Sequence, residues 1–239
     1  MLDLGAARID LADGDRTFRL EVEALRLEPG QMLALTGSSG SGKTLLLELL
    51  GLLRAPGQGT RFRWLGETGE VDLAALWSRG ARNAELSRLR GRLFGFVPQT
   101  GGLMPFLSVA ENIALPQRVN GAPDPGRVEH LMERLGLSDI ARLRPDALSI
   151  GQRQRTAIAR ALSHRPPFVI ADEPTAALDP ETSDRVLDLL LDAARAEGSG
   201  VILSSHDIDR IERFAIPRVA LSAESAGGTV TSRLEGATC

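Results

Sequence analysis

The stretch GSSGSGKT, residues 37–44, constrains the fold of this chain more than any other. It follows a short apolar run, QMLALT, and precedes a leucine-rich segment from Lys43 to about Leu53, so we expect a strand, a glycine-rich loop and a helix. The spacing matches G-x-x-x-x-G-K-[ST], a loop whose backbone N–H groups surround phosphate groups. A flexible Gly/Ser linker is the alternative, but such linkers rarely end in Gly-Lys-Thr between a strand and a helix. The pattern therefore predicts a nucleotide-phosphate site.

Each residue type in this loop has a predicted role. The glycines at positions 37, 40 and 42 let the backbone curl, so that successive N–H groups face phosphate oxygens. Lys43 would reach the β- and γ-phosphates, and the Thr44 hydroxyl would be a ligand of Mg²⁺. The residues expected to contact the nucleotide are Gly37, Ser38, Ser39, Gly40, Ser41, Gly42, Lys43 and Thr44. The loop alone does not identify the reaction, because kinases, GTPases and many ATPases share it.

Composition narrows the class of protein. The 239 residues, 43% of them apolar, suffice for one sizeable domain or one core with a smaller inserted lobe. The 28 Lys and Arg are balanced by 31 Asp and Glu, without the overall basic character that nucleic-acid binding usually leaves. The longest apolar stretch, residues 45–53, contains Glu48 and falls short of the roughly 20 residues of a spanning helix. The first residues lack a signal-peptide pattern, and the single Cys239 rules out an internal disulfide, so we expect a globular cytoplasmic protein.

Two acidic residues follow a second apolar run. The run at 168–171 is apolar at every position, as expected for a buried parallel strand, and Asp172 and Glu173 come directly after it. At such a strand end, Asp172 can hold a metal ion and Glu173 can face an attacking water. A solvated acidic turn is the alternative. A further strand, GVILSSHD, leads to His206, which could reach the γ-phosphate side, although a lone histidine there is more often structural.

The segment LSIGQRQRTAIARAL, residues 148–162, identifies a family. It opens with a Ser-x-Gly-Gln loop and continues with apolar residues at helical spacing. Together with the phosphate loop it resembles the signature motif of ABC (ATP-binding cassette) ATPases, commonly written L-S-G-G-Q, and the order of the motifs agrees. The resemblance covers nearly the whole chain: FGFVPQ places Gln99 in the Q-loop, AALD places Asp179 in the D-loop, and SSHD places His206 in the H-loop.

This resemblance implies the ABC ATPase fold, an α/β P-loop NTPase core with a parallel sheet, an N-terminal antiparallel β subdomain and an inserted helical lobe. Residues 1–239 would form a single such domain, with the core in 1–98 and 163–239 and the helical lobe in 99–162. ATP and Mg²⁺ are the implied cofactors, and ATP hydrolysis is the implied reaction. The implied catalytic residues are Glu173, His206 and Lys43, the implied metal ligands are Thr44, Gln99 and Asp172, and the implied further nucleotide contacts are Gln99, Ser149, Gly151, Gln152 and Asp179.

The resemblance also implies partners. In the family two cassettes pack head to tail, so that each ATP lies between the phosphate loop of one and the signature of the other. The segment FGFVPQTGGLMPFLSVAENIALP resembles bacterial lipoprotein-release and macrolide-export cassettes, which serve a separate membrane permease. Leu103, Met104, Phe106 and Leu107 would either dock this permease or belong to the core of the helical lobe. We expect a motor subunit on the inner face of the cell membrane, in contact with the membrane only through the permease and without a nucleic-acid partner.

Two other functions stay open. An ABC ATPase that acts on nucleic acid or translation is disfavoured by length, because such relatives carry long insertions or fuse two cassettes, whereas this chain has 239 residues. A membrane-tethered signalling or scaffold component differs from a transport motor only in what its partner does.

Three features depart from the family pattern or leave a role open. Ile150 stands where the family commonly has a glycine, so a β-branched side chain enters the signature. The aromatic residue that usually stacks on adenine has no obvious counterpart, since the chain has no tyrosine and Phe18 is only the nearest candidate. Arg153, Arg155 and Arg160 are interpreted as a solvated basic face rather than as ligands.

The remaining segments predict the elements around these sites. Residues 1 to about 35 favour an antiparallel sheet, GTRFRWLG and EVDL continue the short strands, and residues 82–90 favour a helix. Residues from about 100 to 160 favour helices, including an amphipathic one at 127–135. The last strands should form a hairpin that turns at Gly227-Gly228.

Overall fold

The computed structural model describes residues 1–13, 16–67 and 69–235, so Cys239 lies outside the described residues. The chain divides into two compact units. The first unit comprises Met1–Arg90 and the chain from Ser204 onward, and the second comprises Gly91–Leu203. Each unit has its own set of buried apolar side chains.

The first unit is built on a mostly antiparallel sheet. Its strands are β1 (Leu2–Asp13), β2 (Arg16–Leu27), β3 (Met32–Thr36), β4 (Arg61–Gly66), β5 (Gly69–Asp72), β9 (Arg218–Ala226) and β10 (Thr229–Glu235). Their order is β5-β4-β1-β2-β10-β9-β3, in which β10 runs parallel to β2, and β3 runs parallel to β9. The predicted antiparallel pairing of the N-terminal strands and the terminal hairpin at Gly227-Gly228 are confirmed.

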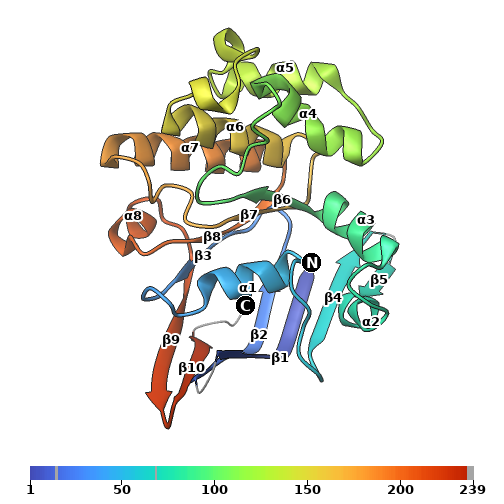
Figure 1. Ribbon diagram of the computed structural model, residues 1–239, viewed down its shortest axis with the longest axis vertical. Helices are drawn as coiled ribbons and strands as arrows, with labels where there is room; N and C mark the ends of the chain where they lie inside the picture. Colours follow the sequence, from blue (N-terminus) through green and yellow to red (C-terminus); the bar gives the residue numbers. More distant parts are fainter. Residues whose placement is uncertain (14–15, 68, 236–239) are drawn as a thin grey trace. The chain divides into compact units, whose positions relative to one another are not determined.

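One helix of this unit positions the phosphate loop. Helix α1 (Lys43–Leu50) is drawn in front of β1 and β2 in Figure 1, and its five leucines are buried. It ends three residues before the predicted Leu53, because Leu52 adopts a left-handed φ of +57° and the Leu53 N–H turns back to the Glu48 carbonyl. The unit also holds α2 (Leu73–Ser78), which the sequence did not predict, and α8 (Ile208–Arg213), and the chain leaves it within α3 (Ala84–Leu93).

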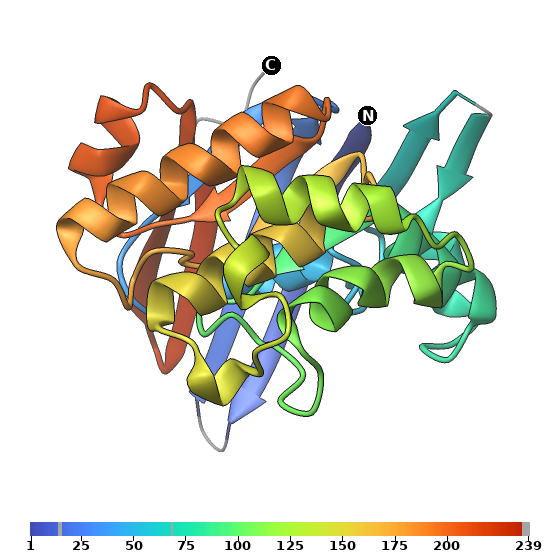
Figure 2. The same cartoon turned by 90° about the horizontal axis from the view of Figure 1, so that it is seen from above.

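The second unit combines a parallel sheet with the helices predicted between residues 100 and 160. Its strands β6 (Phe94–Val97), β7 (Phe168–Ala171) and β8 (Gly200–Ser204) are parallel, with β7 between the other two. The α-helices are α4 (Val109–Val119), α5 (Pro125–Arg134), α6 (Ile150–Leu162) and α7 (Pro180–Ala196), with 3₁₀ turns at Ser138–Ile140 and Pro145–Ala147. The four α-helices lie side by side (Figure 2).

Two strands of the second unit's sheet are fully buried, and for β7 the all-apolar run at 168–171 predicted this. All four residues of β7 and all five of β8 are buried. A Cβ at Gly95 would lie only 2.0 Å from the Ala161 carbonyl oxygen, which shows that helix α6 packs directly on β6. This close approach connects the helix that begins with the signature to the strand that leads to Gln99.

Candidate functional site

The phosphate loop, residues 37–44, connects the end of β3 to the start of α1. Gly37, Gly40 and Gly42 have φ angles of +147°, +76° and +91°, a range that favours glycine. Space also requires glycine at position 37, because a Cβ there would lie 2.6 Å from the Leu221 carbonyl oxygen. A Cβ at Gly42 would come within 2.9 Å of the Phe18 ring. The curled backbone of the loop therefore depends on these glycines.

The N-terminus of α1 has no side-chain cap. Gly42 is its N-cap residue, no side chain caps it, and no acidic residue lies in the first turn. In the part of the chain that the structure describes, every other α-helix begins with a side chain that accepts a backbone N–H: these residues are Asp72, Asn83, Ser108, Asp124, Ser149, Asp179 and Asp207. N-terminal N–H groups without an internal partner attract anions. The start of α1 therefore suits an external anion.

Lys43, the only lysine of the sequence, lies in this loop. It is 6% exposed, and its ammonium donates hydrogen bonds to the carbonyl oxygens of Gly37 at 2.9 Å and Ser38 at 3.1 Å. Residues 38–40 are exposed, whereas the Ser41 hydroxyl is buried and has no hydrogen-bond partner among the described residues. Within the described residues, a fixed cation, a helix start without a side-chain cap and a hydroxyl without a partner in one loop fit the phosphates of a nucleotide.

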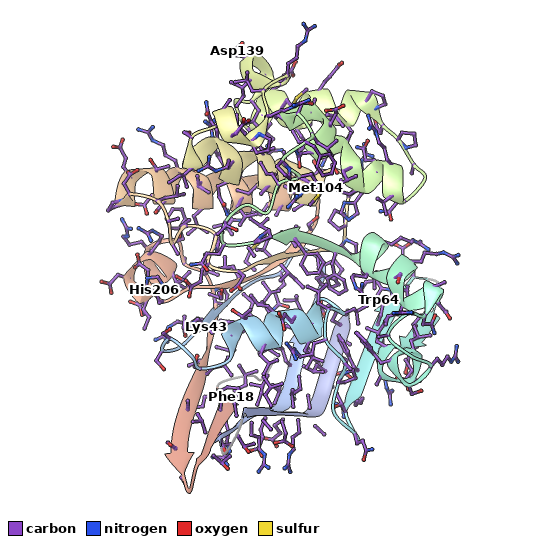
Figure 3. The ribbon with its side chains drawn as sticks, in the orientation of Figure 1. Phe18, Lys43, Trp64, Met104, Asp139 and His206 are labelled. Atoms are coloured by element: carbon purple, nitrogen blue, oxygen red, sulfur yellow. The ribbon has the colours of Figure 1, made fainter. Side chains whose placement is uncertain are left out.

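His206 belongs to the same unit. It is exposed, and the N–H of the preceding Ser205 donates to the Leu35 carbonyl at 3.0 Å. This bond holds the start of the His206 loop at the end of β3, the strand that leads into the phosphate loop; Figure 3 shows His206 and Lys43 in this unit. Thr44 is also exposed, at the first turn of α1. The first unit thus contains the phosphate loop, Lys43, Thr44 and His206.

Asp172 and Glu173 lie at the carboxyl end of β7, in the second unit. The Asp172 N–H donates to the Val97 carbonyl at 3.0 Å, so the acids lie beside the end of β6, two residues before the exposed Gln99. Glu173 has a φ of +43°, a left-handed conformation. This conformation costs a residue other than glycine roughly 1–2 kcal/mol, and such strain concentrates at functional sites. The second unit thus brings together Gln99, Asp172 and Glu173.

The oxygen ligands on the chain suit a metal ion that is bound together with a nucleotide. Within the described residues, no group of three or more His, Cys, Asp or Glu side chains could hold a metal ion. Mg²⁺ commonly takes only one or two protein carboxylates and completes its shell with phosphate and water oxygens. Thr44, Gln99 and Asp172 carry oxygen ligands of this kind, so their chemistry fits Mg²⁺ that arrives with phosphate.

The signature loop, Ser149–Gln152, opens α6. The Ser149 hydroxyl accepts the N–H of Gln152 at 3.2 Å, and the Gln152 side chain accepts the N–H of Ser149 at 2.8 Å, which completes a capping box. Since the Ser149 oxygen acts as acceptor in this bond, its hydroxyl proton can still be donated to an anion. Ile150 is 48% exposed at the first helical position, and its side chain is open to a partner.

A cavity of about 710 Å³ lies between the signature loop and the start of α7. Its lining includes Ile150, Gly151 and Asp179, and a Cβ at Gly151 would lie 3.3 Å from the Thr182 methyl group. Asp179 caps α7 by accepting the Thr182 N–H at 3.0 Å, and this hydrogen bond lowers the pKa of the Asp179 carboxyl. The structure therefore places the predicted D-loop residue beside the signature loop.

The arginines of α6 do not form the solvated basic face that the sequence suggested. Arg153 and Arg155 donate to backbone carbonyls of neighbouring loops at 2.5 and 2.7 Å. Arg160 donates to the carbonyls of Gly102 at 2.7 Å and Gly101 at 3.0 Å, and burial lowers the pKa of its guanidinium. The interpretation was wrong because helical periodicity shows which face is polar, but not which carbonyls a guanidinium can reach.

Two apolar features can now be placed. Phe18 is half-buried with its ring against Gly42, so it supports the back of the phosphate loop. In the segment that we call the docking segment, residues 103–107, Phe106 is 67% exposed, and Leu103, Met104 and Leu107 are half-buried. Asn112, to which the sequence analysis assigned no role, is completely buried and holds this segment by hydrogen bonds to Met104. A polar residue between apolar helical positions was the only signal for it.

A family model described as ABC transporter matches residues 20–176, which contain the phosphate loop, Gln99, the signature loop and the Asp172-Glu173 pair. The chain belongs to the ABC transporter family. As a member of this family it is an ATP-binding cassette with ATPase activity that uses ATP with Mg²⁺. No helix in the described ranges combines the length and apolar character needed to cross a membrane.

The cassette is similar to curated proteins named lipoprotein-releasing system ATP-binding protein LolD. The one from Maricaulis maris is 40% identical over 201 residues, which cover 80% of this chain and 83% of the relative. An uncharacterized ABC transporter ATP-binding protein from Mycobacterium tuberculosis, MT1014, is 40% identical over 182 residues, which cover 75% of this chain and 69% of the relative.

Solved structures confirm the predicted ABC ATPase fold. A dimeric structure of a post-hydrolysis state of the ATP-binding cassette MJ0796, bound to ADP and Pi, matches with a TM-score of 0.74 and 30% identity over 88% of this chain and 90% of that chain. A dimeric structure of MJ0796, described as a bacterial ABC transporter cassette, matches with a TM-score of 0.76 and 29% identity over 98% and 97% of the two chains.

Proposed function

We propose that this cassette is the ATP-hydrolysing motor subunit of a transporter. Two copies close head to tail on ATP, and hydrolysis reopens them to drive a separate membrane permease. The phosphate loop carries this proposal: within the described residues it combines an N-terminus of α1 without a side-chain cap, a buried Lys43 and a Ser41 hydroxyl without a hydrogen-bond partner. The dimeric MJ0796 structures and the LolD relatives support the dimer and the transport role.

The proposed mechanism assigns one task to each group. Lys43 and the N–H groups at the start of α1 bind the β- and γ-phosphates, and Glu173 orients and deprotonates the attacking water. His206 senses the γ-phosphate. Asp172, Thr44 and Gln99 would hold Mg²⁺, which would neutralise phosphate charge.

The signature loop completes the proposed site from the second copy. Ser149 donates its free hydroxyl proton to the γ-phosphate of the partner cassette, and the backbone at Gly151 approaches the same group. Gln152 holds the loop through the capping box, and Asp179 lies beside it at the dimer contact. One domain, with a core in 1–98 and 163–239 and a helical lobe in 99–162, would carry all these groups.

The docking segment supports the permease partner in this proposal. Phe106 is a large apolar side chain with 67% of its surface exposed, and exposed aromatic residues commonly anchor protein interfaces. Since no helix in the described part of the chain could span a membrane, the cassette would reach the inner face of the cell membrane through such a contact. No observation within the described residues favours the scaffold alternative.

Co-purification with a candidate membrane permease tests the proposal. Phe106→Asp should abolish co-purification and permease-stimulated ATP hydrolysis, while ATP binding by the isolated cassette stays within about twofold, because one anchor carries much of such an interface. Val119→Asp is the matched control, since Val119 is 74% exposed at the end of α4 in the same unit. Unchanged co-purification of the Phe106 variant, or hydrolysis by the wild-type cassette that does not respond to the permease, would contradict the proposal.

A further inference from the structure

Arg160 connects the signature helix to the turn that follows Gln99. Two nitrogen atoms of its guanidinium donate to consecutive carbonyl oxygens, Gly102 at 2.7 Å and Gly101 at 3.0 Å. The planar fork of arginine can make such a pair of bonds, whereas the point-like ammonium of lysine cannot reproduce it. The bonds join residues 58 and 59 positions apart in the sequence, so they tie two separate segments together.

The turn itself is shaped for this contact. Gly101 and Gly102 have left-handed φ angles of +77° and +53°, and the Gly101 N–H donates to the Pro98 carbonyl at 2.9 Å. A Cβ at Gly101 would lie 3.5 Å from the Arg153 carbonyl oxygen, so the turn packs on α6 as well. Two carbonyl oxygens of this compact turn therefore come within reach of one guanidinium.

Asn112 on α4 continues the connection towards the exposed Phe106. Its side-chain oxygen accepts the Met104 N–H at 2.8 Å, and its amide donates to the carbonyls of Met104 at 3.2 Å and Leu107 at 3.0 Å. Asn112 is 0% exposed, so these bonds are shielded from water. Phe106, between the two bonded residues, is thus held at a fixed place on the second unit.

At the other end of α6, Arg153 fixes the signature loop. Its guanidinium donates to the Leu148 carbonyl at 2.5 Å, directly before Ser149. Arg153, Arg160 and Asn112 thus make three separate sets of side-chain-to-backbone bonds within the second unit. Helix α6 connects the first two sets, and the chain from Gly101 to Leu107 connects the last two, so together they lead from the signature loop to the docking segment.

We propose that Arg160 is a positioning residue that makes the signature loop and the docking segment move as one body. A displacement of α6 when Ser149 engages ATP is then transmitted to Phe106 through the Gly101-Gly102 turn. The engagement of a second copy's ATP by Ser149 and the consequence for a permease both rest on the proposed function, but the bonds made by Arg160 lie within one cassette. Without Arg160, the signature can still engage ATP while the docking segment no longer responds.

Hydrogen exchange on the isolated cassette tests this link. In the Glu173→Gln background, which retains bound ATP, Mg-ATP should slow amide exchange both at residues 149–153 and at residues 101–107. With Arg160→Gln added, the response at 149–153 should persist, and the response at 101–107 should fall at least about fivefold. In the background with Glu173 intact, basal hydrolysis by Arg160→Gln should stay within about twofold of wild type, while stimulation by the permease is lost.

Arg155→Gln is the matched control. Arg155 lies on the same helix and also donates to two backbone carbonyls, those of Leu135 at 2.7 Å and Gly136 at 3.2 Å, but not to the turn after Gln99. Its removal should leave the response at 101–107 intact. An equal loss of that response in this variant would overturn the specific role of Arg160.

Two further outcomes decide the proposal. If the Arg160→Gln cassette keeps the ATP response at 101–107, the link does not depend on Arg160. If Arg160→Gln unfolds, Arg160→Lys repeats the test with the charge retained, and unfolding of both variants would assign Arg160 to fold stability and overturn the proposal. A wild-type cassette that shows the exchange response but no stimulation by the permease would contradict the proposed function and leave the link standing.

Discussion

The N-termini of α1 and α6 are assigned to the same γ-phosphate, but they are constructed differently. Helix α1 begins at Gly42 without a side-chain cap and has the buried Lys43 in its first turn. Helix α6 begins with a complete Ser149–Gln152 capping box and has no lysine. Among the described residues the first end has no side-chain cap, whereas the second has a complete one.

This difference indicates which helix end contributes to nucleotide affinity and which contributes to dimerisation. An uncapped helix end with a fixed cation gains free energy from any suitable phosphate, so α1 should bind nucleotide in the isolated cassette. The capped end of α6 gains only the donation from the Ser149 hydroxyl and the contact with the backbone at Gly151, so it should matter when a second copy has brought ATP close. The phosphate loop is therefore expected to set affinity, and the signature loop to set dimerisation and turnover.

The largest expected effect tests whether the phosphate loop of one copy meets the signature loop of a second copy in a dimer. Replacing Cys239 by Ser removes the only cysteine, and Ser39→Cys with Ser149→Cys then places one thiol in each loop. In the Glu173→Gln background, a short bifunctional thiol linker should give covalent dimer with Mg-ATP and almost none with ADP. The measurement is the mass of the product, since a link within one chain leaves a monomer.

Two controls accompany this experiment. Each single-cysteine variant should give much less dimer, because its thiols would lie at different composite sites. If the double variant stays monomeric, the permease should be added, because it raises the effective concentration of the two cassettes. Absence of dimer there too would remove the shared site.

Glu173→Gln should reduce ATP turnover at least about 10²-fold, the usual scale for a lost general base. The variant keeps the shape of the side chain at its left-handed backbone position, so ATP affinity should stay within about twofold of the wild type. Single-turnover hydrolysis and equilibrium titration measure the two quantities separately. Near-normal turnover would reject Glu173 as the base, and lost affinity would show that the change disturbs the fold of the site.

Lys43→Ala should weaken ATP binding about 10- to 100-fold, because hydrogen bonds to charged groups contribute roughly 1.5–3 kcal/mol. Ser39→Ala changes an exposed side chain of the same loop without altering charge, and is the control.

A second measurement uses the chemistry of Lys43. As Lys43 is the only lysine, mass spectrometry of amine acetylation reports on it directly. Mg-ATP should slow acetylation of Lys43 while the Met1 amino group reacts as before; equal rates would count against the phosphate loop as the binding element.

The smallest expected effect separates the cap of α6 from its donor. Ser149→Ala removes both, and should cost about 1 kcal/mol of unfolding free energy while leaving ATP affinity of the isolated cassette unchanged. Ser149→Asp retains a good N-cap but places a carboxylate towards the phosphate, so stability should be preserved and ATP-driven dimer lost. Urea unfolding and crosslinking measure these outcomes. A loss of monomer affinity in Ser149→Ala would show that α6 shares the initial binding.

Much of the fold followed from local patterns. The all-apolar run at 168–171 became β7, the Gly-rich stretch at 37–44 became the predicted loop between a strand and a helix, and the Ser-x-Gly-Gln segment became the start of α6. The end of α1 was predicted less well, because Leu52 adopts a left-handed conformation that its side chain does not favour. The sequence analysis missed helix α2 because its six residues are too few to show a helical periodicity.

The sequence predicted the candidate site best where the interacting residues lie within one short segment. Glycines, Lys43 and the capping pair Ser149 and Gln152 act on neighbours a few residues away, so their spacing in the sequence already expresses their geometry. The arginines of α6 show the opposite case. Their charge pattern predicted a solvated surface. Arg160 instead donates to carbonyls 58 and 59 positions away in the sequence, on a turn that lies near it only in the folded structure.

The sequence by itself determined the reaction family and the local form of each motif, because backbone preference and hydrophobic period operate over a few residues. Only the tertiary structure decided that Phe18 backs Gly42, that Leu221 forbids a side chain at Gly37, and that Asn112 holds the docking segment. Such contacts join elements that are distant along the chain. Their partners are chosen by how helices and strands pack, and that choice has no short-range signal in the order of residues.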